Sequence, residues 1–411
     1  MNASESELRT FRTSVRDVLA ARLTRRRAGD SFTVLGAGSD DVEAGRAYLR
    51  ALADGGWAVP TWPKEYGGLG ATPAQAAVVA QELAHFDVPD LYPYVIGLAI
   101  AGPTLIAHAT PEQCSRWLPA IRTGDEIWCQ LFSEPDAGSD LASLATRAER
   151  DGDQWRVTGA KVWSSRAHYS QRGLLLARTD PSVPKHAGIT AFALDMHAPG
   201  VTVSPLRQMN GDTHFSEVHL DHASVDDHDR IDAPGNGWRV ARTALTYERG
   251  AGAVGGGGWG ADLKDRLLDL AHRRGAAGDP VLRQRLAATI IELEVARMTA
   301  RRARDAAKAG RSPGPEGSGA KLRGSAGLKA AASLGLELLG PDGIAPVEGD
   351  GDGGEWQTLF LTSPSISIRG GTDEIQRNIV GERVLGLPPE PRADVDVPFS
   401  ELQRTVSRGE R

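Results

Sequence analysis

The 411-residue sequence is long enough to bury a large core and suggests two or three domains. Its 47 basic and 53 acidic side chains give a net charge of −6 and are spread throughout, which argues against a surface that binds nucleic acid or anionic membranes. With two cysteines, no basic-then-apolar N-terminal signal and no apolar run near the roughly 20 residues of a membrane span, we expect a cytoplasmic protein without nucleic-acid or membrane partners.

The first 125 residues are predicted to form an N-terminal α-helical domain. Apolar side chains recur at helical spacing in five segments, which are 5–28, 42–55, 73–86, 92–109 and 111–123. The segments 29–41 and 56–70 between them are predicted to be loops or irregular structure.

Composition changes after residue 125 to short apolar or alternating runs separated by Gly, Pro, Asp and Asn, the spacing of an antiparallel sheet or barrel. The predicted strands are 127–132, 154–159, 174–177, 188–194, 201–206 and 215–220. We assign residues 126–234 to a central β-barrel-like domain.

Helical periodicity returns after residue 237 and continues to Ala309, with one break at 275–280. It resumes from Lys321 to Leu339, so residues 235–411 are predicted to be a C-terminal α-helical bundle domain. Because the order is α, then β, then α without β-α alternation, the predicted fold class is multi-domain α+β rather than a doubly wound sheet.

The stretch Ser365–Arg383 combines a glycine turn with the start of a helix. An extended phrase, Ile366–Ile368, precedes the glycines, and Thr372 is a suitable N-cap. Glycines let a backbone approach a ligand, and free amides at a helix start favour anions. Taken alone, the stretch is more simply an ordinary turn before a C-terminal helix.

Two polar strand ends and one indole favour a site for a flat, polar heteroaromatic ligand. The turn that follows Gln130 and Phe132 offers the hydroxyls and close amides of Ser133, Gly138 and Ser139. The second strand end, Lys161–Ser165, offers Trp163 for stacking and two hydroxyls. Two polar hairpin turns would explain either segment alone but explain the pair less well.

Other motifs give weaker signals. Four histidines lie close together at positions 214, 219, 222 and 228, but two of them would face opposite sides of a strand, so we expect solvated histidines and no metal site. The G-x-G-x-x-G matches at Gly250 and Gly255 follow helical residues instead of a strand, which favours close helix packing over dinucleotide binding.

Several specific segments resemble the acyl-CoA dehydrogenase family, in the family's order and over nearly the whole chain. They are GWAVPTWPKEYGGLG (56–70), SEPDAGSD (133–140), KVWSS (161–165), PLRQMNGDTHFSEVHLD (205–221), PGPEGS (313–318) and GGTDEIQRNIVGERVLGLP (370–388). The resemblance implies an N-terminal helical domain, a central antiparallel β-domain and a C-terminal four-helix bundle. It also implies FAD between the last two domains and a homotetramer or homodimer.

The resemblance further implies individual roles at the cofactor. Around the isoalloxazine ring these fall to Gln130, Phe132, Ser133, Trp163 and Ser165, with Gly138 and Ser139 near the thioester and the CoA entrance. Thr372 and Glu374 match positions that contact the adenylate half of FAD, and Arg273 and Arg283 would reach the cofactor of a neighbouring subunit.

The implied reaction is α,β-dehydrogenation of an acyl-CoA thioester to a trans-2-enoyl-CoA. A base removes the α-proton, the β-hydrogen leaves as hydride, and the electrons pass to an electron-transfer flavoprotein. Many relatives carry the base as Glu at the position of Gly370, which here retains only the backbone N–H that stabilises the enolate oxygen.

A second branch of the family places the base on the first bundle helix, where Glu248 stands in this sequence. Ala241, Leu245 and Glu248 share one helix face, which would point the carboxylate inward. A salt-bridged glutamate beside Arg249 is the alternative; together with Gly370, the family frame favours catalysis.

The acyl group itself is less well defined by the sequence. The helix from Tyr92 would line the acyl pocket through Val95, Leu98 and Ala99, with Arg249 and Arg369 as further candidates for substrate contact. Three alternatives remain open: an oxidase of the same fold, an enzyme acting on carrier-protein-bound acyl groups, and a non-catalytic partner subunit.

Overall fold

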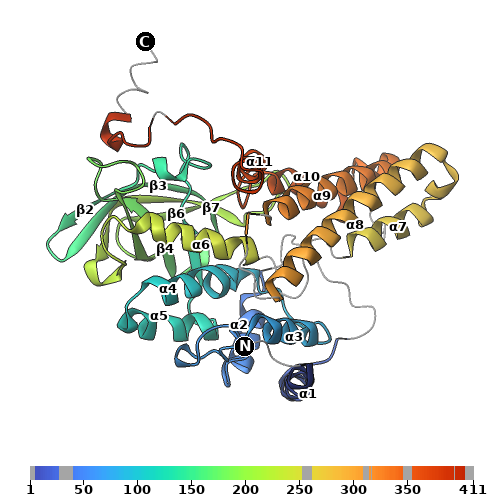
Figure 1. Ribbon diagram of the computed structural model, residues 1–411, viewed down its shortest axis with the longest axis horizontal. Helices are drawn as coiled ribbons and strands as arrows, with labels where there is room; N and C mark the ends of the chain where they lie inside the picture. The colour runs from blue at the N-terminus through green and yellow to red at the C-terminus, as the bar shows by residue number, and fades with distance from the viewer. Residues whose placement is uncertain are drawn as a thin grey trace, which may run out of the picture. The chain divides into compact units, whose positions relative to one another are not determined.

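The computed structural model describes residues 5–26, 40–251, 262–308, 314–315, 317–345, 354–392 and 394–402. These residues divide into two compact units (Figure 1). The first unit contains the described residues up to 251 and those from 391 onward, and the second contains those from 262 to 390.

The N-terminal part of the first unit is helical, as predicted. Its α-helices are α1 (Glu5–Arg22), α2 (Val42–Ala53), α3 (Pro73–Leu83), α4 (Gly102–His108) and α5 (Pro111–Thr123), with a 3-10 turn η1 (Lys64–Tyr66). Helices α3 and α5 both begin with a Thr-Pro pair and a reciprocal Thr/Gln capping box. These boxes satisfy the first backbone donors and fix where each helix starts.

The prediction of one continuous helix over 92–109 is wrong. The segment consists of a 3-10 turn η2 (Tyr92–Tyr94), a π-helix η3 (Ile96–Ala101) and α4. Pro103 lacks an N–H and cannot donate the hydrogen bond that a regular α-helix requires. The Gly102 amide donates to the carbonyl of Gly97, in the wider hydrogen-bond pattern of a π-helix. The irregular segment η3 packs against both β1 and α6.

The β-region is one eight-stranded sheet in the order β6-β7-β3-β2-β4-β5-β8, with β1 paired to β4. Its strands are β1 (Trp128–Leu131), β2 (Arg147–Asp151), β3 (Gln154–Ser165), β4 (Arg172–Arg178), β5 (Ile189–Asp195), β6 (Val201–Leu206), β7 (Phe215–Asp226) and β8 (Arg230–Ile231). The sheet is mixed and not purely antiparallel, since β1 and β2 each pair with β4 in parallel. Strand β2 escapes prediction because only Ala148 of its five residues is buried.

The end of β3 is bent out of the regular ladder. The pairing of β3 with β7 shifts register between Lys161 and Ser164, and Trp163 and Arg166 have φ angles of 60° and 55°. Arg166 is buried and donates to Asp40 from Nε at 3.0 Å and from Nη2 at 2.7 Å. This ion pair ties the bent strand end to the segment that leads into α2.

Helix α6 (Gly237–Ala251) packs within the first unit. It contacts η3, α4 and β5, and its Val240, Ala241 and Ala244 are fully buried. The segment 394–402 also belongs to this unit, where the ring of Phe399 lies 3.5 Å from the Arg178 guanidinium.

The second unit is helical. It contains α7 (Leu263–Arg273), α8 (Pro280–Lys308), α9 (Gly317–Leu339), α10 (Glu355–Ile366) and α11 (Asp373–Ile379), which runs into a π-helix η9 (Val380–Val384). Helix α9 packs against the other four α-helices. The predicted break at 275–280 is confirmed, but 366–368 is not extended: α10 ends at Ile366 and a turn follows.

Gly335 offers a test of the packing of α9 on α10. A methyl group on Gly335 would lie 2.1 Å from a ring carbon of Trp356, whereas Gly324 on the same helix has no neighbour within 4 Å. Gly335→Ala should therefore lower the stability of the bundle by about 1–3 kcal/mol. Gly324→Ala should leave it unchanged or raise it by up to about 1 kcal/mol. Urea unfolding followed by tryptophan fluorescence measures both, and equal midpoints would contradict this packing.

Candidate active site

Glu248 lies at the end of the buried stripe of α6 and faces strand β1. It follows Ala241 and Ala244 at helical spacing, is half-buried, and accepts a hydrogen bond from Gln130 Nε2 to its Oε2 at 3.3 Å. The inward orientation expected from the helix face is thus observed. A carboxylate held by an amide donor at the edge of a core has the placement that a general base requires.

The predicted acyl-pocket residues lie on the element beside this carboxylate. Leu98 is buried in η3, Ala99 is half-buried there, and Val95 is half-buried just before it. Because η3 packs against both α6 and β1, these side chains belong to the neighbourhood of Glu248 and Gln130.

The two polar strand ends are joined directly. The amide of Val162 donates to the carbonyl of Ser133 at 2.9 Å, which places the first turn against the end of β3. Phe132 is buried, Ser133 and Ser165 are half-buried, and Trp163 is 61% exposed with its ring edge-on to Phe215. Gly138 and Ser139 lie exposed further along the same turn.

The chemistry of this region fits a flat heteroaromatic cofactor. An exposed indole beside serine hydroxyls combines a stacking surface with neutral donors and acceptors. The hydroxyl of Ser164 is buried and has no hydrogen-bond partner within the described residues. A ligand at this strand end would cover the exposed apolar surface of the indole, whereas the Ser164 hydroxyl is buried on the other side of the strand.

A buried ion pair beneath the strand ends has no role in the sequence-based predictions. Lys161 Nζ lies 2.7 Å from Glu134 Oε1, and both side chains are buried. The sequence does contain a signal for the burial of Lys161. Trp155, Val157 and Lys161 share one parity along β3, so Lys161 occupies an inward position.

The glycine turn of the second unit has the predicted helix start. Thr372 caps α11 by accepting from the Ile375 amide at 3.2 Å. Gly370 has φ +65°, is exposed, and accepts at its carbonyl a hydrogen bond of 2.9 Å from Gln376. A left-handed conformation suits glycine, so the backbone conformation alone explains why a glycine stands at this position.

The remaining predicted contacts of the second unit lie at its surface. Glu374 is exposed and 3.5 Å from Arg377, Arg369 is half-buried, and Arg273 lies 2.9 Å from Asp269. Arg283 is exposed on α8. The side chain of Arg249 and the motif that begins at Gly255 lie outside the described residues.

The clustered histidines do not share one environment. His219, His222 and His228 are exposed, as expected. His222 faces the solvent like His219, although their parity differs, because the pairing shifts register between them and His222 has φ 51°. His214 is not solvated: it is largely buried, and its ring nitrogens lie 3.7 Å from Asp40 and 3.2 Å from Asp212.

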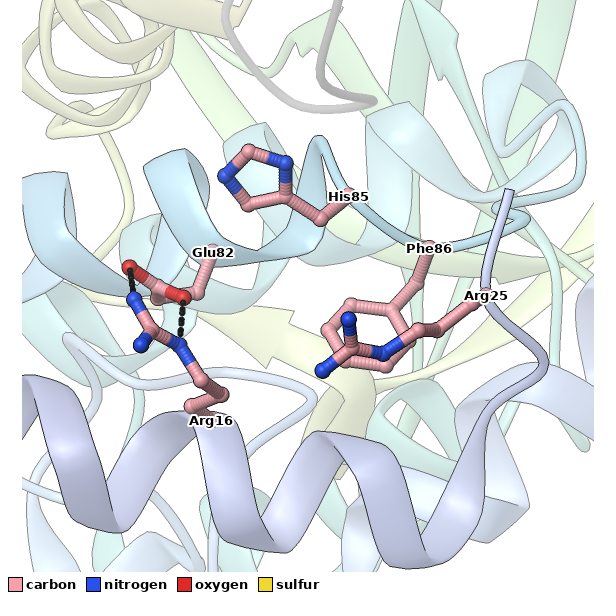
Figure 2. A pocket seen from close by; sticks show the side chains of 5 residues that line it. All are labelled: Arg16, Arg25, Glu82, His85 and Phe86. Carbon is pink, nitrogen blue, oxygen red and sulfur yellow. Dashed lines mark hydrogen bonds and ion pairs between the residues drawn. The ribbon is translucent and has the colours of Figure 1, made fainter. Parts of the chain in front are cut away.

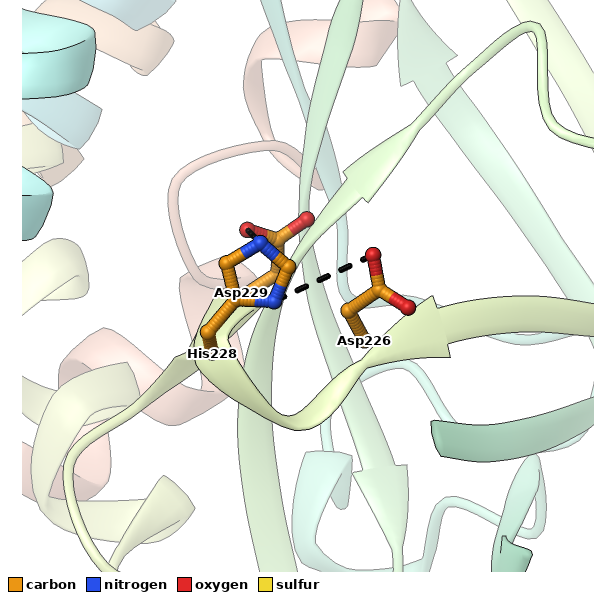
Figure 3. A group of neighbouring side chains, drawn as sticks. All are labelled: Asp226, His228 and Asp229. Atoms are coloured by element: carbon orange, nitrogen blue, oxygen red, sulfur yellow. Dashed lines mark ion pairs between the residues drawn. The ribbon is translucent and has the colours of Figure 1, made fainter. Parts of the chain in front are cut away.

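One histidine does belong to a group with metal-like spacing, formed by Asp226, His228 and Asp229 (Figure 3). Asp229 is already paired with Arg116, and Arg172 lies 3.8 Å away. Arginines that neutralise a carboxylate compete with a cation for it, so this group is better explained as a surface ion-pair network.

The first unit also contains a hollow of about 250 Å³ lined by Arg16, Arg25, Glu82, His85 and Phe86 (Figure 2). Glu82 is buried there and bound by Arg16 and Arg12. The hollow shares no residue with the Glu248 site, and its charged lining differs from the apolar lining usual for ligand sites.

Three domain models of one family match the chain in sequence order. They are described as the N-terminal domain (residues 5–125), the middle domain (129–223) and the C-terminal domain (235–385) of acyl-CoA dehydrogenase. The chain belongs to the acyl-CoA dehydrogenase family. Members are FAD-dependent oxidoreductases, and the helical–β–helical architecture described above is the family's fold.

Similar proteins give the same assignment. An acyl-CoA dehydrogenase named IpdE1 from Mycobacterium tuberculosis is 40% identical over 94% of this chain and 99% of its own length. FadE34 of the same organism is 42% identical over 82% of this chain but only 46% of its own length. The solved structure of the Tcur3481-Tcur3483 steroid ACAD has a TM-score of 0.75 at 27% identity, covering 94% of this chain and 99% of that one. Like these enzymes, the chain is an acyl-CoA dehydrogenase.

No helix among the residues that the structure describes combines the length and the apolar character needed to cross a membrane.

The contact between Gln130 and Glu248 predicts a pH effect. Gln130→Glu would put a second carboxylate about 3 Å from Glu248, and two adjacent carboxylates resist ionising together. The acid limb of the kcat/KM profile should therefore move to higher pH by about one unit.

Gln154→Glu is the matched control, because Gln154 Nε2 donates in the same way to Asp226, 2.8 Å away, outside the site. Its pH profile should be that of the unmodified enzyme. Identical profiles for the two variants would show that the carboxylate beside Gln130 does not control the acid limb.

Proposed function

We propose that Glu248 is the general base of an FAD-dependent α,β-dehydrogenation of an acyl-CoA thioester. The observation that carries this proposal is the Glu248 carboxylate, held by Gln130 at the end of the buried face of α6. It is strengthened by Gly370, which has no carboxylate at the position where many family members carry their base.

Each proposed residue has a defined task. Glu248 takes the α-proton of the thioester, and Gln130 orients the carboxylate that receives it. Gly370 supplies a backbone N–H for the oxygen that becomes negatively charged when the proton leaves. Val95, Leu98 and Ala99 form an apolar wall that keeps water from the α-carbon.

The residues proposed to hold FAD are those of the two strand ends, with further contacts in the second unit. Phe132, Ser133, Trp163 and Ser165 are proposed for the isoalloxazine ring, and Thr372 and Glu374 for the adenylate half. Gly138 and Ser139 are proposed at the CoA entrance. When bound, the flavin supplies the acceptor for the β-hydrogen and its electron pair.

The acyl group is proposed to be bulky and steroid-derived rather than a simple straight chain. The support is the similar solved enzyme whose title calls it a steroid ACAD. A panel of straight-chain, branched and steroid-carboxyl CoA esters, assayed with an artificial electron acceptor, tests this. Highest kcat/KM on a straight-chain ester would overturn it.

The enzyme is proposed to work as an oligomer and to pass electrons to an electron-transfer flavoprotein. Two similar structures, at 27% and 26% identity, are titled by pairs of polypeptides, Tcur3481-Tcur3483 and ChsE4-ChsE5 from M. tuberculosis. They support a partner chain of the same family as an alternative to self-association. Light scattering of the purified protein alone separates the two: a stable flavin-bearing homotetramer or homodimer would exclude a required second chain.

Glu248→Gln tests the base directly. The amide keeps the shape and the contact with Gln130 but cannot accept a proton, so anaerobic bleaching of the flavin by substrate should slow by at least about 100-fold while FAD stays bound. Glu149→Gln, at an exposed carboxylate on β2, is the control and should bleach normally. Normal bleaching by Glu248→Gln would eliminate Glu248 as the base.

The alternatives to dehydrogenation have separate readouts. Release of H2O2 in air during turnover would identify an oxidase, and activity confined to acyl groups on a carrier protein would identify a different substrate class. A purified protein that is colourless and binds no added FAD would indicate a non-catalytic subunit.

A further inference from the structure

The buried pair of Lys161 and Glu134 lies beneath both strand ends of the candidate cofactor site. The Lys161 side chain is completely buried and that of Glu134 is 8% exposed. Burying two charges costs several kcal/mol each, and apolar replacements of such pairs are often no less stable. The pair therefore calls for an explanation beyond stability.

Lys161 holds the backbone of the first strand end. Its Nζ donates to the carbonyl of Phe132 at 3.1 Å, and the amide of the next residue, Val162, donates to the carbonyl of Ser133 at 2.9 Å. Two consecutive carbonyls are thus bound from β3, whereas consecutive carbonyls of a regular strand point to opposite sides. This arrangement sets the direction in which the Phe132–Ser133 backbone leaves β1.

Glu134 connects the same segment to a third element. Its Oε2 accepts from the Ala145 amide at 2.7 Å and its Oε1 accepts from the Thr146 amide at 3.0 Å. Burial acts to raise the pKa of Glu134, but the charge of Lys161 and these hydrogen bonds outweigh it and hold the pKa below its usual value. The carboxylate is therefore ionised and satisfied. Burial lowers the pKa of Lys161, and Glu134 is the counter-ion that opposes this lowering.

Lys161 also stands directly before the second register shift of β3. The register with β7 is lost directly after it, and Trp163, two residues on, has φ 60° and an exposed indole. One ammonium group thus connects the irregular end of β3 to the turn that follows β1. Its distance from the solvent excludes any direct contact with a ligand.

We infer that Lys161 is a positioning residue that fixes the Phe132–Ser133 backbone relative to Trp163 and Ser165, with Glu134 as its counter-ion. The inference rests on the proposed function, because those four residues are the ones proposed to hold the isoalloxazine ring. A change in this spacing alters the hydrogen bonds and stacking at the ring and so alters its affinity, its spectrum and its reduction potential.

Two variants separate positioning from charge balance. Lys161→Met removes the donor to Phe132 and leaves Glu134 buried without its cation, so it should weaken FAD binding and lower the melting temperature. Lys161→Met/Glu134→Gln removes both charges, while the amide oxygen of Gln still accepts from Ala145 or Thr146. The double variant should recover most of the melting temperature but not the flavin binding.

The matched control is Lys185→Met. Lys185 is also buried and paired, with Asp140 at 2.8 Å and Asp394 at 2.5 Å. Its ammonium group donates to Asp140, whereas the Phe132 and Ser133 carbonyls are bound from β3. Its removal should therefore lower stability with little change in the flavin spectrum or reduction potential.

The measurements are FAD titration of the apoprotein, the flavin absorption spectrum and the flavin reduction potential, each on the full chain. The double variant should show a Kd for FAD raised at least about tenfold and a shifted spectrum and potential. If the double variant instead recovered wild-type FAD affinity, spectrum and reduction potential together with stability, the pair would serve only to balance charge. That result would overturn the inference. Failure of the unmodified protein to bind FAD would instead overturn the proposed function.

Discussion

The packing of α6 on η3, α4 and β5 is the constraint on which the candidate active site depends. The fully buried Val240, Ala241 and Ala244 hold the helix within the first unit, and the next turn then carries Glu248 to Gln130. Since the rotation of a helix is fixed by the face that it buries, the direction of the carboxylate follows from ordinary packing. A carboxylate placed in this way needs only one amide donor in addition to orient it.

The two strand ends of the candidate site are likewise positioned by ordinary packing and hydrogen bonds. The paired strands lead up to Leu131 and Lys161, and beyond these residues the chain has bends, positive φ angles and side chain-to-backbone hydrogen bonds. Binding groups are thus carried by irregular segments that a rigid sheet holds in place. Charged side chains buried beneath these segments, Lys161 with Glu134 and Arg166 with Asp40, replace the backbone pairing that the ladder no longer provides.

The family assignment and the site support one another but rest on different observations. Matches along the chain establish an acyl-CoA dehydrogenase. They do not say where the base is, and the resemblance to the family leaves Gly370 and Glu248 as its two candidate positions. The glycine at 370 removes one of these, and the contact of Glu248 with Gln130 supports the other. The identity of the acyl group and of any partner chain depends on surfaces outside these contacts. Substrate panels and light scattering therefore test them.

The sequence by itself determined the order of helical, β and helical regions, the cap at Thr372 and the helix face of Glu248. Each of these follows from local spacing or from hydrogen bonds between residues close in the chain. Only the tertiary structure decided the parallel pairing of β1 and β2 with β4, the π-helical form of η3 and the partners of Lys161 and Arg166. These features join residues distant in sequence or depend on competing backbone hydrogen bonds, and periodicity carries no information about such partners.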